Sequence, residues 1–170
     1  EEPAFNLDVK YAGETVASKL ARIREEMKEA GTNVHVVSTI DDICWTLNIR
    51  GNDIDFFPLV LSYGIITMDS FELYIDEKKL DDKLKAKLAK DGVNLHPYND
   101  IYEDVKKFGS DVVAMIDPGK LNYALFNNIP ENVKTVEKRN PAILMKAIKN
   151  PVEIENIRKA QIKDLSLIHI

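Results

Sequence analysis

The chain has 170 residues, of which 45% are apolar and 30% are charged, and its formal net charge is −5. This length and apolar content suffice for one ordinary hydrophobic core. Because both signs of charge are interspersed in a mildly acidic chain, nucleic acid and anionic membranes are not expected as partners. The one cysteine excludes an internal disulfide and fits a reducing cytosol. The sequence has no apolar run long enough to predict a membrane span.

The first residues are expected to precede the folded unit. Residues 1–13 carry Pro3, Gly13 and few periodic apolar residues, which predicts an extended linker. Apolar residues then fall at helical spacing from 14 to 30, and Gly31 follows where a helix C-terminus prefers glycine. The sequence does not begin with methionine, so we expect it to be a piece of a longer protein.

Strands and helices are then expected to alternate. The apolar runs predict strands over 34–39, 58–67, 71–75, 93–98, 111–117 and 132–137. Helical spacing predicts helices over 38–48, around Leu80, Leu84 and Leu88, and over 101–108 and 121–129. This alternation predicts an α/β fold, a three-layer α-β-α sandwich spanning 14–145. A hairpin turn at Asp69 and Ser70 makes the sheet mixed, although mostly parallel.

The last part of the sequence differs from this pattern. Asn150, Pro151 and Glu153 form a strong helix start, with Asn as the N-cap, Pro at the first helical position and Glu at the third. Because nothing after this helix completes a fold, residues 146–164 are interpreted as the first helix of another domain. The final LSLIHI, 165–170, equals a translation of an adapter used in transposon-based library preparation. We therefore expect a non-native, aggregation-prone tail, with a genuine apolar helix end as the alternative.

Few residues suggest metal chemistry. The three histidines, His35, His96 and His169, have no metal-ligand spacing, and each is interpreted as structural or as a surface residue. The pair Asp41 and Asp42 could bind a cation or act as an acid and base. Acids at this position more often complement a helix N-terminus, and we favour that interpretation.

Nucleophilic and phosphate-binding patterns are equally weak. Cys44 lies in the middle of a predicted helix beside Trp45, which favours buried packing over a reactive thiol. The DPGK stretch, 117–120, lacks the spacing of a phosphate-binding loop and is interpreted as a turn that opens a helix.

The stretch LNIRGNDI, 47–54, places polar residues among apolar ones and has two interpretations. The first is structural: a connection between helix and strand, with Gly51 at a special backbone angle and Arg50 paired to Asp53 or Asp55.

The second interpretation of this loop is functional. Arg50 and Asn48 would project from the sheet edge and recognise anions and hydrogen-bonding groups. Phe56 and Phe57 would then add an apolar contact face. The sequence alone leaves both interpretations open.

Several stretches resemble one known family. DDICWTLNIRGNDIDFFPLVLSYGIIT, 41–67, is similar to the signature of the non-catalytic N-terminal module of Xaa-Pro aminopeptidases, in the creatinase/aminopeptidase P family. The matching stretches before and after it are YAGETVASKLARIREEM, VNLHPYNDIY and NPAILMKAIKNPVEIENIRKAQIKD. The resemblance covers about residues 9–164. The chain resembles in particular the second module of the long, three-domain form, truncated where the catalytic domain begins.

The resemblance implies a parent enzyme with its chemistry elsewhere. Such a parent is a cytoplasmic homodimer that removes an N-terminal residue preceding proline from short peptides. It uses two divalent metals, usually manganese, held by two Asp, one His and two Glu of its catalytic domain. The fragment itself is then expected to bind no metal, to have no activity and to contact its own catalytic domain. Asn48, Arg50, Gly51 and Asp53 become candidates for the edge of the substrate cleft.

Two alternatives stay open. The chain could come from an inactive binding or scaffolding protein that kept the module and lost catalysis. It could instead come from a prolidase-like or creatine-hydrolysing parent. The IRGNDI form favours the long aminopeptidase, by analogy only.

Overall fold

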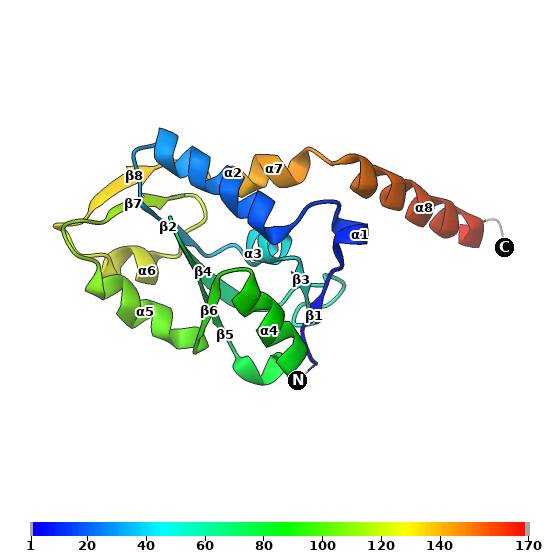
Figure 1. Cartoon of the computed structure of the whole chain (residues 1–170), viewed down its shortest axis with the longest axis horizontal. Coiled ribbons are helices and arrows are strands. Elements are labelled where there is room, and N and C mark those ends of the chain that lie inside the picture. The colour runs from blue at the N-terminus through cyan, green and yellow to red at the C-terminus, as the bar shows by residue number, and fades with distance from the viewer. Residues whose placement is uncertain (1, 169–170) are drawn as a thin grey trace.

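A computed structural model describes residues 2–168 and shows one mixed sheet with helices on both faces (Figure 1). The strands are β1 (Phe5–Asn6), β2 (Val34–Val37), β3 (Ile49–Arg50), β4 (Ser62–Thr67), β5 (Phe71–Ile75), β6 (Val93–His96), β7 (Val113–Ile116) and β8 (Lys134–Glu137). The helices are α1 (Val9–Ala12), α2 (Val16–Glu29), α3 (Ile40–Leu47), α4 (Asp82–Lys90), α5 (Ile101–Asp104), α6 (Tyr123–Asn128), α7 (Pro141–Ala147) and α8 (Pro151–Ile168). Over these residues, no helix is both long enough and apolar enough to cross a membrane.

The main sheet has six strands in the order β6-β5-β4-β2-β7-β8. The pairs β2–β7, β5–β6 and β7–β8 are parallel, whereas β2–β4 and β4–β5 are antiparallel. The hairpin between β4 and β5 turns at Asp69 and Ser70, as predicted. The structure therefore confirms the α/β class and the mixed, mostly parallel sheet.

Two apolar cores lie on opposite faces of this sheet. The larger core joins residues of α2, α3, α4 and α7, among them Leu20, Ile43 and Leu88, to β5 residues such as Leu73. The smaller core joins residues of α5 and α6 to β2, β4 and β7. Neighbouring residues of one strand enter different cores because successive side chains of a strand point to opposite faces. The three-layer arrangement predicted from the sequence is thus confirmed.

The N-terminal segment is more ordered than the expected extended linker. β1 pairs with β3 in a separate two-stranded ribbon, with Phe5 opposite Arg50. α1 ends at Gly13, whose φ is 72°, and a β-carbon there would lie 2.2 Å from the Asn150 side chain. The Asn150 amide also donates to the Ala12 carbonyl at 2.8 Å. Residues 5–13 are therefore anchored to both β3 and the start of α8.

Several element boundaries differ from the sequence-based prediction. The strand expected over 58–67 begins at Ser62, and residues 58–61 instead belong to the loop that joins β3 to β4. From sequence, Thr39 and Asp42 are spaced like a capping box at the start of α3. Thr39 does occupy the N-cap position, but its hydroxyl donates to the Asp42 carboxylate at 2.6 Å and caps no backbone N–H. Helix α7 was not predicted, although Asn140 caps it by accepting from the Ala142 N–H at 3.1 Å.

Helix α8 leaves the body of the molecule, as the orange-to-red ribbon of Figure 1 shows. Asn150 is its N-cap, as predicted, and the start forms a capping box: Glu153 accepts from the Asn150 N–H and Asn150 accepts from the Glu153 N–H, both at 2.9 Å. Leu165 and Leu167, in the expected non-native tail, are helical and exposed. His169 lies outside the described residues, and the origin of the tail stays a prediction.

Candidate functional site

Asn48, the first candidate, closes helix α3 and points inward. It adopts the left-handed conformation, with φ at 52°, which asparagine tolerates better than most residues. Its side-chain oxygen accepts from the Lys19 ammonium at 2.7 Å, and its amide donates to the Glu14 carbonyl at 2.9 Å. Asn48 is buried, so the expectation that it projects from the sheet edge is wrong.

Arg50, the second candidate, is half-buried on β3 and keeps part of its guanidinium free. Its Nη1 donates to the carbonyls of Cys44 and Ile49, at 2.9 and 2.8 Å. Among the described residues, Nε and Nη2 have no hydrogen-bond partner, and Arg50 has no ion pair. Burial lowers the pKa of Arg50 below its usual value, but a guanidinium stays charged at neutral pH. The predicted pairing of Arg50 with Asp53 or Asp55 is therefore wrong.

Gly51, the third candidate, is required by a close approach of two chain segments. Its φ is not positive, so the predicted special backbone angle is wrong. A β-carbon at Gly51 would lie 2.9 Å from the Val60 β-carbon and 3.2 Å from the Leu59 carbonyl oxygen. The absence of a side chain thus lets the loop return beside β3.

Asp53, the fourth candidate, fastens the loop to the molecule. Its carboxylate forms an ion pair with Lys79 at the end of the 3₁₀ turn Glu77–Lys79. The same carboxylate accepts from the Leu61 N–H at 2.7 Å. Both charged side chains are about nine-tenths buried, with 10% and 9% exposure. The structure therefore gives Asp53 an inward, bracing position.

The tip of the loop presents apolar rings to solvent. Phe56 is fully exposed and has a φ of 67°, and Phe57 is 61% exposed. A bulky residue in the left-handed region is a strained choice for a turn. The apolar face expected from the sequence is present, and what it contacts stays a prediction.

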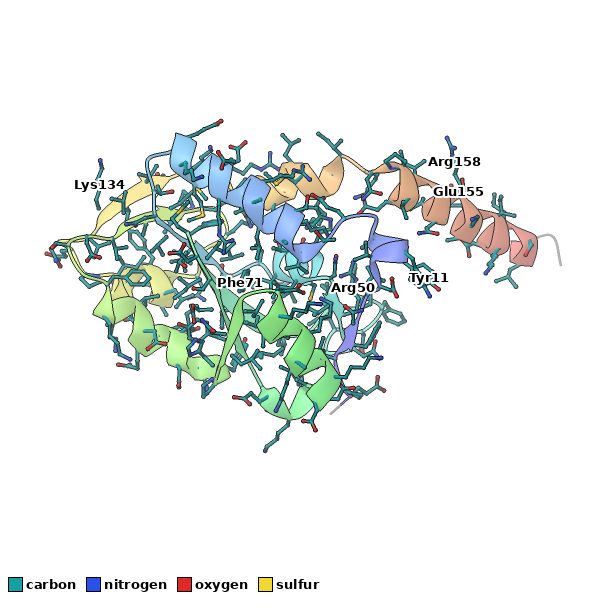
Figure 2. All side chains as sticks on the ribbon, viewed as in Figure 1. Tyr11, Arg50, Phe71, Lys134, Glu155 and Arg158 are labelled. Carbon is teal, nitrogen blue, oxygen red and sulfur yellow. The ribbon has the colours of Figure 1, made fainter. Side chains whose placement is uncertain are left out.

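A cavity of about 210 Å³ lies where α1, α3 and the start of α8 meet. Arg50 and Asn48 line it, whereas Gly51 and Asp53 do not. Tyr11 and Arg50, both labelled in Figure 2, belong to the same lining. The remaining lining residues are Leu7, Ala12, Lys19, Trp45, Lys149, Glu153, Asn156 and Ile157. The structure thus brings together two of the four candidates.

Lys19 is the most deeply buried charged residue of the lining, and the sequence did not single it out. It is 1% exposed, and its ammonium donates to the Trp45 carbonyl at 2.7 Å and lies 4.2 Å from the centroid of the Trp45 ring. Burial lowers the pKa of Lys19 to about 8, and the nearby Glu14 opposes this shift. The burial of Lys19 could have been predicted from its position in α2, because a residue three positions after Val16 lies on the core-facing stripe of the helix.

The other chemical candidates are structural. Cys44 is buried, and burial raises the pKa of its thiol, which confirms the packing interpretation. His35 is buried between the Met115 carbonyl and the Asn140 side chain, and burial lowers its pKa. Between residues 2 and 168, no group of three or more His, Cys, Asp or Glu side chains could hold a metal ion.

The acid pair at the start of α3 binds a lysine. Asp42 accepts from the Lys146 ammonium at 2.7 Å and from the Asn140 amide at 2.9 Å. Asp41 also pairs with Lys146. These contacts join α3 to α7, and the pair complements a cation as well as a helix N-terminus.

The mixed sheet and the two helix layers form a fold that solved peptidase structures share. The X-prolyl aminopeptidase of Caenorhabditis elegans, described as a cytosolic enzyme with a di-nuclear active site, superposes with a TM-score of 0.88 at 32% identity. The match covers 93% of this chain and 26% of that one. A Xaa-Pro dipeptidase of Bacillus anthracis, at 16% identity and a TM-score of 0.68, shares the fold.

Residues 1–153 match the family model of the creatinase/prolidase N-terminal domain, and the chain belongs to this family. A probable Xaa-Pro aminopeptidase P of Neurospora crassa is 37% identical over 96% of the chain. Xaa-Pro aminopeptidase 1 of Dictyostelium discoideum is 40% identical over 94% of it. The chain spans about 25% of the length of each of these relatives. The resemblance read from the sequence is thus confirmed.

Proposed function

We propose that the chain serves as a non-catalytic module of a Xaa-Pro aminopeptidase, where it helps wall the substrate cleft and assemble a dimer. One observation carries this proposal: the identity of 37–40% along nearly the whole chain with proteins named as Xaa-Pro aminopeptidases. Those relatives extend well beyond the matched part, which leaves ample polypeptide for a separate catalytic domain.

The reacting groups in this proposal belong to that further polypeptide. The C. elegans relative is described with a di-nuclear active site. Two divalent metals, manganese by our expectation, would be held by side chains of that further polypeptide and would supply the activation of water for hydrolysis of the peptide bond before proline. In this proposal, the described residues of this chain contribute shape and charge.

Arg50 and the exposed tip of the loop after β3 support the contribution to a cleft. Arg50 retains an unpaired charge and free N–H groups, which suit a peptide carbonyl or carboxylate. Phe56 and Phe57 add an apolar tip on the same loop, and such rings are typical anchors in protein interfaces. Asn48, Gly51 and Asp53 would then act indirectly by holding Arg50 and the tip in place.

A prolidase-like parent is the weaker alternative. The Pyrococcus horikoshii prolidase matches at 21% identity with a TM-score of 0.58, which supports a shared fold and no more. A cytoplasmic location for the parent is supported by the description of the C. elegans relative as a cytosolic enzyme.

The test is Arg50→Ala in the longer protein that carries this module. We expect kcat/KM for a proline-second peptide to fall about tenfold, because one charged hydrogen-bonding group is removed from the cleft. Arg24→Ala is the matched control, since Arg24 also donates to two carbonyls, of Thr67 and Ser70, and does not line the cavity. Unchanged kinetics, thermal stability and oligomeric state for Arg50→Ala would contradict the proposal.

A further inference from the structure

The cavity at the base of α8 gathers positive charge in an otherwise acidic protein. Lys19, Arg50 and Lys149 line it, against the single acid Glu153, whereas the whole chain carries a formal net charge of −5. The Glu153 carboxylate accepts from the Asn150 N–H in the capping box, and its charge favours the charged forms of both Lys19 and Arg50. Three cations against one acid leave the lining with an excess of positive charge.

The two central cations also have no carboxylate of their own. Among the described residues, neither Lys19 nor Arg50 has an ion pair within 4.0 Å. Glu14, the acid that most favours the charge of Lys19, forms its ion pair with Arg22 at 2.9 Å. A cation as well buried as Lys19 is normally paired with an acid, so its lack of an ion pair is unusual.

The free side of Arg50 has the geometry of a carboxylate receptor. A guanidinium has five N–H donors, and the two on Nη1 account for the bonds to the Cys44 and Ile49 carbonyls. The donors on Nε and Nη2 lie parallel on one edge of the guanidinium, which is the fork that binds both oxygens of a carboxylate. The contacts of Nη1 hold this fork in place before any ligand arrives.

Two further lining residues have polar side chains, but neither is an open donor. The indole N–H of Trp45 is enclosed, and it has no hydrogen-bond partner between residues 2 and 168. The Asn156 amide, on α8, already donates to the Tyr11 carbonyl at 3.2 Å, so recognition of an acid group falls to Arg50. The volume of about 210 Å³ is smaller than the roughly 300–1,000 Å³ of drug-sized sites, so the cavity suits one small acid group.

We propose that this cavity binds a carboxylate, held by the free fork of Arg50 and attracted by the charge of Lys19. The carboxylate belongs either to the C-terminus of a short peptide or to an acidic side chain. Because α1, α3 and α8 each contribute to the wall, an occupied cavity would also fix α8 against the body of the module. This site needs no second domain, so it stands or falls separately from the proposed role in a substrate cleft.

The experiment is a titration of this chain with sodium acetate at constant ionic strength. Trp45 is the only tryptophan, so its fluorescence reports on the cavity directly. We expect a saturable change with a dissociation constant of roughly 1–10 mM, as two charge-assisted hydrogen bonds allow after the cost of association. Sodium chloride at the same ionic strength should produce no saturable change. No saturation with acetate, or the same change with chloride, would overturn the proposal.

Variants and ligand analogues sharpen the result. Arg50→Lys keeps the charge and loses the fork, so acetate affinity should fall about tenfold or more, whereas Arg24→Gln should leave it unchanged. If the bound carboxylate is a peptide C-terminus, glycylglycine should bind and its C-terminal amide should not. If it is an acidic side chain, the compound that binds should instead be aspartate with an acetylated amino group and an amidated α-carboxyl group. Equal affinity of the wild type and Arg50→Lys for acetate would also overturn the proposal.

Discussion

The pair Asp53–Lys79 gives the sharpest test of how the loop after β3 is held. In Asp53→Ala the Lys79 ammonium keeps its site, where the side chain is only 9% exposed, and loses its counter-charge. The Leu61 N–H loses its acceptor as well. Removing one partner of a buried ion pair destabilises a protein by about 3–5 kcal/mol. Since 1 kcal/mol shifts the midpoint of a chain of this size by about 2–4 °C, we expect a fall of roughly 6–20 °C.

The assay is thermal and urea unfolding followed by circular dichroism. The double variant with Lys79→Met should recover much of the lost stability, because no charge is then left buried. Glu155→Ala is the control: its pair with Lys159 is exposed and should contribute under about 1 kcal/mol. A loss below about 1 kcal/mol for Asp53→Ala, or no recovery in the double variant, would refute the bracing role of Asp53.

Three further predictions concern the same region. Because the pKa of Lys19 is lowered to about 8 in the folded state, the unfolded chain binds more protons than the folded chain between pH 8 and 10.5. In urea titrations across this pH range, the unfolding free energy of the wild type should therefore rise by about 3 kcal/mol relative to that of Lys19→Met. A difference that does not change with pH would contradict the burial of a charged Lys19. Gly51→Ala should lower the unfolding free energy by about 1–3 kcal/mol through overpacking against Val60, whereas Gly119→Ala, where a β-carbon would lie 3.5 Å from its nearest neighbour, should change it by under about 0.5 kcal/mol. Equal effects of the two substitutions in urea unfolding would refute the close approach. Phe56→Asn should leave stability unchanged or raise it by up to about 1 kcal/mol, because asparagine tolerates a positive φ and no packing is lost; a large loss in thermal unfolding would show that the ring is packed.

Much of the fold could be predicted because its signals are local. The apolar run of β2, the helical spacing of α2 and the capping residues of α8 each lie within a few neighbouring residues. Helix α7 has the same start signal, since Asn140 and Pro141 repeat the pattern of Asn150 and Pro151. It was missed because the helix is short and has little apolar periodicity.

The candidate site could be predicted only in part, because its geometry depends on distant partners. Asn48 is turned inward by Lys19, 29 residues earlier, and Asp53 is turned inward by Lys79, 26 residues later. Neither partner lies within reach of a local pattern. The sequence could indicate that 47–58 is an unusual loop, and the long-range contacts decide which of its polar groups remain available.

The central claim is that this module supplies shape and charge to a reaction whose metal-binding residues belong to other polypeptide. The most direct measurement is hydrolysis of a proline-second dipeptide by the purified 170-residue chain with added manganese, beside a full-length Xaa-Pro aminopeptidase as positive control. We predict release of the N-terminal residue by the full-length enzyme and none by the chain. Turnover by the chain, persisting through repurification to a constant specific activity, would contradict the account.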